Sequence, residues 1–161
     1  MKVIDNFLPE YQFNKLSSFL MGDNFPWFYN DSIIKKNDGL SQFTHTFYDT
    51  RSYWNGGTIY FSDIIEPILY NFDLTKLHRV KSNMRFKSWF KRGSGYHRDM
   101  DNVTTAILYI NTNNGYTKFK KGGKVKSVAN RVVIFDSNLE HMGYACTNEK
   151  RRIVVNFNYE R

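Results

Sequence analysis

The pattern of residues after position 76 constrains the fold of this chain more than any other feature. Short β-rich segments follow one another there and are separated by Gly, Asn and Asp residues. The expected strands cover about 77–81, 84–91, 103–111, 115–120, 124–128, 131–135, 140–144 and 151–159. Short strands at such close intervals favour two packed sheets or a barrel over alternating strands and helices. We therefore expect a β-sandwich in the C-terminal half.

Two helices are expected in the N-terminal half. The first begins at Pro9, a favourable residue for a first helical turn, and ends at Gly22. The second covers about 62–72 and carries an apolar stripe, with Pro67 in or near its first turn. Residues 23–57 are aromatic and irregular, and no element is assigned to them. The fold class is thus α+β, with the helices packed on the outside of one sheet.

Composition excludes several classes of protein. Aromatic residues make up 17% of the 161 residues, which is too many for a disordered chain. No apolar run approaches the ~18 residues that a membrane-spanning helix needs. The start, MKVIDNFLPEY, carries acids and a proline where a signal peptide is apolar. The lone Cys146 cannot form an internal disulfide, so we expect a buried thiol in a cytoplasmic protein of one domain.

Lysine and arginine exceed the acidic residues, giving a net charge of +8. This surplus favours anionic partners such as nucleic acid, nucleotides or acidic peptides. The densest cluster is KFKKGGKVK, residues 118–126. We interpret it first as the charged faces of two strands that flank a turn at Gly122 and Gly123.

The stretch GYHRDMDN, residues 95–102, places His97 and Asp99 two positions apart. On an extended segment both side chains point to one face, although such a pair also arises by chance on polar loops. His141 follows Asp99 by 42 residues, at the start of an expected strand, and offers a third ligand. Two histidines and one carboxylate on one face leave three coordination positions open, as in non-haem Fe(II) oxygenases, although Zn, Mn, Co or Ni suit the same ligands. The other histidines, His45 and His78, are expected to be structural or on the surface.

The last strand, RRIVVNFNYE (151–160), has one polar and one apolar face. Alternation places Arg152, Asn156 and Asn158 on one face, and Arg151 on the other with the apolar side chains. A polar face inside a sandwich is unfavourable unless a polar ligand fills the space. A dicarboxylate would fit, because a guanidinium binds a carboxylate through two parallel hydrogen bonds. The alternative is that both arginines cap an exposed strand end.

Three stretches resemble the core of the 2-oxoglutarate/Fe(II)-dependent dioxygenases, especially the prolyl hydroxylase branch. They are WFKRGSGYHRDMDNVTTAILYIN (89–111), VVIFDSNLEHMGY (132–144) and RRIVVNFNYE. The likeness covers about 84–160, and VIDNFLPEY resembles the start of small phage and bacterial members. It implies a double-stranded β-helix, a jelly-roll or cupin-like fold, with a helical part over about 1–75 and a core over about 76–160. It also implies Fe(II), 2-oxoglutarate as cosubstrate, O₂, and ascorbate as a stimulant.

The resemblance assigns roles to individual residues. His97, Asp99 and His141 match the iron ligands. A basic residue about ten positions after the distal histidine binds the far carboxylate of 2-oxoglutarate in this family. That position matches Arg151 or Arg152.

We prefer Arg152 as this anchor, because Asn156 shares its face of the strand. Tyr109 matches a family tyrosine that hydrogen-bonds the same carboxylate. Trp89 stands where relatives often have tyrosine, and an indole has no hydroxyl group to make the tyrosine's contact. Arg98, between two ligands, is expected to point away from the metal toward the rim of the cleft.

The implied reaction couples oxidative decarboxylation of 2-oxoglutarate to oxidation of a second substrate. Three interpretations stay open: a hydroxylase of a polypeptide with proline as a candidate residue, a nucleic-acid or nucleotide oxygenase or demethylase, and a non-catalytic jelly-roll binding module. Several aromatic side chains of the N-terminal region are expected either to line the substrate groove or to belong to the core. They are Trp27, Phe28, Tyr48, Tyr53 and Trp54. The oligomeric state stays open, and no membrane association is expected.

Overall fold

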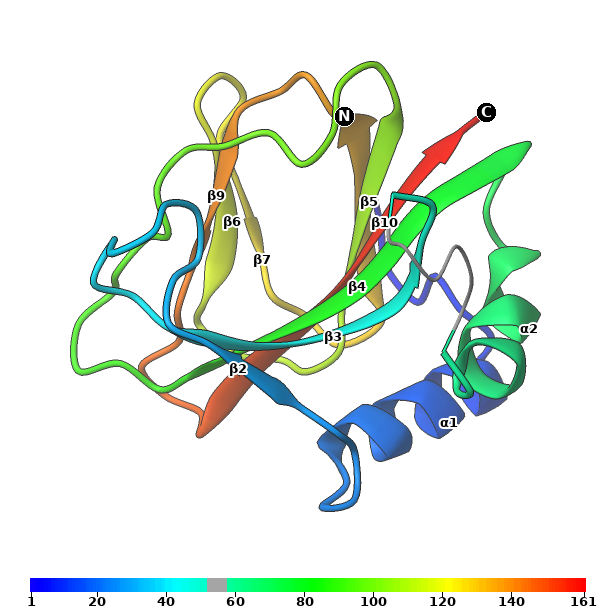
Figure 1. Ribbon diagram of the computed structural model, residues 1–161, viewed down its shortest axis with the longest axis horizontal. Helices are drawn as coiled ribbons and strands as arrows, with labels where there is room; N and C mark the ends of the chain where they lie inside the picture. The colour runs from blue at the N-terminus through cyan, green and yellow to red at the C-terminus, as the bar shows by residue number, and fades with distance from the viewer. Residues whose placement is uncertain (52–57) are drawn as a thin grey trace.

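Two antiparallel sheets face each other in the computed structural model, which describes residues 1–51 and 58–161 (Figure 1). The larger sheet has the order β1-β8-β5-β10-β4-β3-β2, and the smaller one the order β7-β6-β9. The strands of the larger sheet are β1 (Lys2–Ile4), β2 (Phe28–Asn30), β3 (Gln42–Asp49), β4 (Lys76–Phe86), β5 (Thr104–Tyr109), β8 (Arg131–Asp136) and β10 (Arg151–Glu160). Those of the smaller sheet are β6 (Tyr116–Phe119), β7 (Lys124–Lys126) and β9 (His141–Tyr144). This arrangement is a double-stranded β-helix, as predicted.

The strands after residue 100 lie where the sequence predicts them, but β4 differs. It runs without a break through residues 76–86, where two shorter strands were expected. The gap between the two expected strands includes Ser82. A serine hydroxyl is unfavourable in a buried position unless it forms a hydrogen bond. The hydroxyl of Ser82 donates a hydrogen bond to the His45 carbonyl oxygen at 3.3 Å, so Ser82 is buried without interrupting the strand.

The N-terminal part contributes strands as well as helices. β2 and β3 form within residues 23–57, to which no element was assigned, and β1 pairs with β8. β3 pairs along most of its length with β4, so it extends the large sheet beyond the β-helix core. The boundary expected near residue 75 therefore does not separate helices from sheet.

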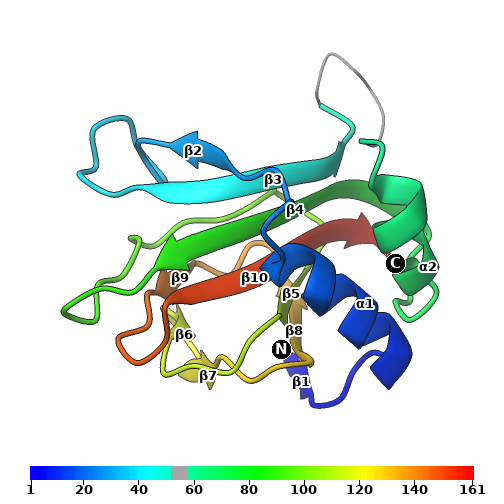
Figure 2. The same cartoon turned by 90° about the horizontal axis from the view of Figure 1, so that it is seen from below.

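Two helical segments cover the face of the large sheet that points away from β6, β7 and β9 (Figures 1 and 2). The first, α1 (Glu10–Met21), begins after Pro9 and ends at Gly22, as predicted. The second opens as a π-helical turn (Phe61–Ile65) and continues as α2 (Glu66–Leu69), with Pro67 in its first turn. Buried side chains of these helices share one core cluster with β10 residues, namely Leu16, Leu20, Ile65 and Ile68 with Ile153, Val155 and Phe157. Burial of this apolar surface holds the helices on the sheet, as expected.

A second apolar cluster lies between the two sheets. It contains Ile107, Tyr109, Phe119, Val125, Val133, Phe135 and Val154. This cluster fills only part of the space between the sheets, and the rest is a cavity lined mainly by the polar side chains described below. Among the described residues, no helix has the length and apolar character needed to cross a bilayer.

Candidate metal centre

His97, Asp99 and His141 come together on the inner side of the β-helix. The segment before β5 runs beside β9, and the main chains of His97 and His141 exchange two hydrogen bonds of 3.0 Å. Ser94 adds two more bonds to Gly143 of β9, through its N–H and its hydroxyl oxygen. The two imidazole rings consequently lie 4.7 Å apart between their centroids. Pairing with β9 is what brings the two halves of the triad together.

The ligand atoms of the triad converge on one point. One atom from each residue lies within 4.8 Å of the others. Nε2 of His97 is 3.7 Å from Oδ1 of Asp99, and Nε2 of His141 is 3.7 Å from Oδ2 of the same carboxylate. Two ligands at right angles around an ion, each about 2.1 Å away, lie about 3 Å apart. Two of these separations therefore need to shorten by about 0.7 Å, and the widest by up to about 1.8 Å, for the three groups to share a metal.

Both imidazoles present the same nitrogen to this point. Nδ1 of His97 lies 3.2 Å from the Gly95 carbonyl oxygen, and Nδ1 of His141 lies 3.2 Å from that of Leu139. Each Nδ1 donates its proton to a carbonyl, so each Nε2 keeps a lone pair directed at the shared point. Burial lowers the pKa of His141, which favours the neutral form that a metal needs.

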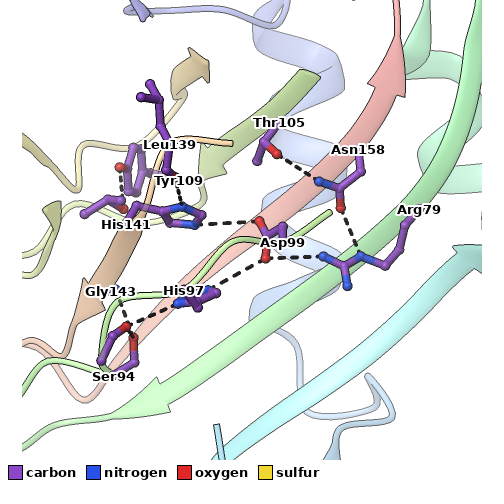
Figure 3. Close-up of polar contacts among 12 residues, drawn as sticks. Arg79, Ser94, His97, Asp99, Thr105, Tyr109, Leu139, His141, Gly143 and Asn158 are labelled. Atoms are coloured by element: carbon purple, nitrogen blue, oxygen red, sulfur yellow. Dashed lines mark hydrogen bonds and ion pairs between the residues drawn. The ribbon is translucent and has the colours of Figure 1, made fainter. Parts of the chain in front are cut away.

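Asp99 is held by a chain of contacts across the large sheet (Figure 3). Nη2 of Arg79 lies 3.3 Å from Oδ1 of Asp99, and Nε of Arg79 donates to Oδ1 of Asn158 at 3.0 Å. The amide of Asn158 in turn donates to the hydroxyl oxygen of Thr105 at 2.9 Å. Oδ2 of Asp99 is buried and accepts no hydrogen bond from the described residues. A buried oxygen without a donor is unfavourable, and a cation at the triad would satisfy it.

A cavity of about 270 Å³ opens beside the triad. Its described lining includes Ile33, Ile34, Gln42, Arg79, Lys81, Asn83, Arg85, Ser94, His97, Arg98, Asp99, Ile107, Thr117, His141, Gly143, Arg152, Val154 and Asn156. Five of these residues are lysine or arginine, and Asp99 is the one acid among them. The charge of this lining favours an anion, and the lining includes the three residues that could hold a metal ion.

Arg152 reaches this cavity from β10, whereas Arg151 does not. The Arg152 guanidinium donates to Oγ of Ser127 at 2.8 Å and to Oγ1 of Thr117 at 3.2 Å, and the residue is only 5% exposed. It forms no ion pair with any acid in the described parts of the chain, and burial lowers its pKa. Arg151 points to the opposite face and donates to the carbonyl oxygen of Met21. A buried guanidinium without an acidic partner is costly, and a carboxylate bound in the cavity would offset this cost.

Gly115 makes room for the Arg152 side chain. A Cβ atom on Gly115 would lie 2.7 Å from Cδ of Arg152 and 2.8 Å from the Tyr144 carbonyl oxygen. Separations under 3 Å are not tolerated between such atoms. The absence of a side chain at position 115 thus leaves room for the Arg152 side chain.

The other predicted cosubstrate contacts are arranged around Arg152. Asn156 lines the cavity, and its Oδ1 is buried without a hydrogen-bond donor among the described residues. The hydroxyl of Tyr109 donates to Oγ1 of Thr117 at 2.8 Å, and the Tyr109 ring lies under the Arg152 guanidinium at 5.5 Å. Tyr109 therefore lies behind Thr117, which is the hydroxyl that faces the cavity.

Three of the four remaining candidates, His45, His78 and Trp89, lie away from the triad, and Arg98 lies beside it. His45 is buried among Phe25, Phe47 and other rings on the helix side, and His78 contacts Glu160 at 2.6 Å. Trp89 is 94% exposed, and Arg98 lines the cavity.

Three aromatic candidates for the substrate groove, Trp27, Phe28 and Tyr48, are absent from the described cavity lining. Trp27 and Tyr48 pack against the helix-side core, and Phe28 is exposed. Tyr53 and Trp54 lie outside the described residues.

Sequence reasoning did not identify the cavity residues of β4. Arg79, Lys81, Asn83 and Arg85 alternate with buried Val80, Ser82 and Met84. This alternation is a strand signal with one polar face, but it becomes visible only when residues 76–86 are read as one strand. Thr117 was missed as well, because a lone threonine on a strand carries no distinctive signal.

Comparison with known proteins establishes the fold. No family model and no curated protein matches the sequence. A prolyl-4-hydroxylase from Pseudomonas putida superposes with a TM-score of 0.65 at 14% identity, over 99% of this chain and 92% of that one. An α-ketoglutarate-dependent non-haem carbocyclase, SnoK from nogalamycin biosynthesis, gives 0.68 at 10% identity, over 98% and 78% of the two chains.

A prolyl hydroxylase from Trichoplax adhaerens also superposes, and its structure contains a peptide fragment of hypoxia inducible factor. Its TM-score is 0.58 at 13% identity, over 99% of this chain and 83% of that chain. At such low identities the likeness establishes the fold. The chain therefore has the double-stranded β-helix of the prolyl hydroxylases and 2-oxoglutarate oxygenases, as the sequence predicted.

Proposed function

We propose that this chain, as one domain, is a 2-oxoglutarate- and Fe(II)-dependent dioxygenase. The observation that supports this most directly is the cavity shared by His97, Asp99 and His141 with the unpaired guanidinium of Arg152. Imidazole and carboxylate ligands on one side suit Fe(II) and leave positions for a chelating cosubstrate and O₂. When bound, Fe(II) supplies the O₂ chemistry that couples decarboxylation of 2-oxoglutarate to oxidation of a substrate.

The two ends of the cavity have different roles in this proposal, metal binding and carboxylate binding. At one end the triad holds the metal, and Arg79 keeps the Asp99 carboxylate in place. At the other end Arg152 binds the far carboxylate of 2-oxoglutarate. The Thr117 hydroxyl, which accepts a bond from Tyr109, is free to donate its own proton to that carboxylate. The amide of Asn156 lies beside this path and supplies a further polar contact.

We further propose that the substrate is a polypeptide, with proline as the candidate residue. The prolyl hydroxylases of similar fold support this choice, one of them with a bound peptide fragment. Enzymes that act on a nucleobase stack it on aromatic or apolar side chains. No phenylalanine, tyrosine or tryptophan belongs to the described lining of this cavity.

A nucleic-acid or nucleotide oxygenase, or a demethylase, is the second candidate. The observation that favours it is the net charge of +8, with exposed lysines on the hairpin of β6 and β7. A non-catalytic binding module is disfavoured, because a module of that kind has no use for a complete triad beside an anion site. A reducing compartment such as the cytoplasm suits both Fe(II) and the buried thiol of Cys146.

The deciding experiment is to incubate the purified protein with Fe(II), ascorbate and labelled 2-oxoglutarate and to measure succinate. Proline-containing peptides and oligonucleotides are added in parallel, and mass spectrometry detects a gain of about 16 Da or the loss of a methyl group. We expect succinate from the wild type and none from Asp99→Ala, with the far-ultraviolet circular dichroism of both proteins unchanged. Equal turnover in folded Asp99→Ala would refute the assignment, and no succinate from the wild type under any condition would favour the binding module.

A further inference from the structure

A row of polar side chains on β4 forms one wall of the cavity. Arg79, Lys81, Asn83 and Arg85 all point into it, because alternate residues of a strand share a face. β4 lies between β10, which carries Arg152, and β3, beyond which the sheet ends at β2. The row therefore lines the side of the cavity toward the sheet edge, away from the cluster of apolar side chains between the sheets.

The cations of this row differ in their partners. Arg79 is paired with Asp99. Arg85 is opposite Arg152 in the strand register and donates to the Gly143 carbonyl oxygen at 3.0 Å, so it belongs to the arginine end of the cavity. The side chain of Lys81 makes no hydrogen bond and no ion pair with any residue in the described parts of the chain. Its ammonium group is half-buried, and burial lowers its pKa, although the charges of Asp99 and Asp49 act on it from beyond ion-pair distance in the opposite direction.

The described cavity lining contains five lysine or arginine residues and one acid. Binding of Fe(II) and 2-oxoglutarate to the proposed enzyme does not remove this excess of positive charge. Fe(II) brings two positive charges and 2-oxoglutarate two negative ones, so the net charge of the cavity stays as it was. The far carboxylate of the cosubstrate is already matched by Arg152. A half-buried ammonium without an anionic partner is unfavourable. The remaining ligand, the substrate, is the natural source of that partner.

We propose that Lys81 binds an acidic side chain of the polypeptide substrate, close in sequence to the residue that is oxidised. This inference rests on the proposed function. Lys81 is two residues from Arg79, about 6–7 Å along the strand, and Arg79 contacts a metal ligand. An anion held by Lys81 is thus within about one or two residues of the oxidised position, because extended residues are about 3.3 Å apart.

The other residues near Lys81 suit a peptide. The carboxamides of Gln42, Asn83 and Asn156 line the same cavity and are able to bond peptide N–H and C=O groups. Ile33 and Ile34 supply an apolar contact in the same lining. A carboxylate requires only one cation and a few amide donors, whereas a nucleotide requires in addition a surface for its base.

Binding to an unreactive form of the protein tests the inference without turnover. The probes are fluorescent proline-containing peptides of one composition in which the residues beside proline are Asp, Asn or Lys. The protein is loaded with Zn(II) and N-oxalylglycine, an unreactive mimic of 2-oxoglutarate, and anisotropy gives each Kd. We expect the Asp peptide to bind at least about tenfold more tightly than the Asn peptide.

Substitutions at Lys81 assign the preference to this side chain. Lys81→Gln should bring the Kd values of the Asp and Asn peptides within about twofold of each other. Lys81→Glu should reverse the preference in favour of the Lys peptide. The matched control is Lys118→Gln, which removes an exposed lysine of β6 and should leave the preference unchanged.

Three results would overturn the inference. They are equal affinity of the wild type for the Asp and Asn peptides, an Asp preference that survives in Lys81→Glu, and a nucleoside monophosphate that binds through Lys81 more tightly than the Asp peptide. The succinate assay separates this inference from the proposed function. Selective binding of the Asp peptide without succinate would support the acidic-peptide site and refute the oxygenase.

Discussion

The guanidinium of Arg79 lies 3.3 Å from the carboxylate of Asp99, and this ion pair joins β4 to the segment that carries two of the three candidate metal ligands. Both side chains are largely buried, at 13% and 8% exposed. Arg79 is in turn fixed by its bond to Asn158. The pair is therefore placed to orient Asp99 in the proposed metal site, since ligands are commonly fixed by outer hydrogen bonds and ion pairs.

Replacing Arg79 should weaken metal binding without removing a ligand. We expect Arg79→Gln to lower the affinity for Co(II), used as a spectroscopic substitute for Fe(II), by about 10–100-fold. Arg79→Lys should restore part of this affinity, because it keeps the charge but loses the bond to Asn158. Titration followed by the visible absorption of Co(II) measures each affinity. An affinity in Arg79→Gln equal to that of the exposed control Lys124→Gln would contradict the positioning role.

The two neighbouring arginines of β10 should respond differently to substitution. Arg152→Gln removes the buried cation that faces the cavity, and we expect the KM for 2-oxoglutarate to rise by about 30-fold or more. Arg151→Gln removes only a bond to Met21 at the end of α1, so its KM should change by less than about threefold. Initial rates of succinate formation at varied concentrations of 2-oxoglutarate give the KM of each variant. A larger effect at Arg151 would show that the anchor had been assigned to the wrong face.

Much of the fold could be predicted from the sequence, because the relevant strands alternate in polarity. The sequence RRIVVNFNYE shows the polar face of β10 directly. Strand alternation alone places Arg152 and Arg151 on opposite faces of the sheet. β3 escaped prediction because its sequence, QFTHTFYD, has buried polar residues on both faces: Thr44 accepts a hydrogen bond from Asn30, and His45 on the other face bonds the Pro26 carbonyl oxygen. Only tertiary pairing with β4 reveals it as a strand.

The candidate site could be predicted in part for a similar reason. His97, Asp99, His141 and Arg152 have residue types and spacings that are informative from the sequence alone. Lys81 and Thr117 became visible only from the packing of β4 and β6 against the cavity, since neither residue type is unusual on a strand.

His45 should make the metal-free protein less stable in acid. Burial among aromatic rings lowers its pKa from the ordinary value near 6.5. The unfolded chain then binds a proton that the folded chain does not, so the free energy of unfolding falls as pH drops below about 6.5 toward the lower folded-state pKa. Urea unfolding between pH 7.5 and pH 5.5 measures this decline. His45→Phe, which keeps a ring in the site, should show a smaller decline, and an unchanged pH dependence would exclude this origin.

The hydroxyl groups of Tyr109 and Thr117 form a hydrogen-bonded chain that ends at the proposed carboxylate site. Substitutions at the two residues should raise the KM for 2-oxoglutarate by different amounts. Tyr109 donates to Thr117, and Thr117 also accepts a bond from Arg152, so the Thr117 proton is the one left for the cosubstrate. We expect Thr117→Val, which keeps the shape, to raise the KM for 2-oxoglutarate by about tenfold.

Tyr109→Phe should raise this KM by less than about threefold, because Thr117 keeps its own proton and its bond to Arg152. The same order should hold for the Kd of N-oxalylglycine measured with Zn(II), where turnover plays no part. Thr117→Ser retains the hydroxyl group. It should therefore keep most of the affinity for N-oxalylglycine that Thr117→Val loses. If Tyr109→Phe proved the more damaging change, the tyrosine hydroxyl would itself contact the carboxylate, and Thr117 would serve only to hold Arg152.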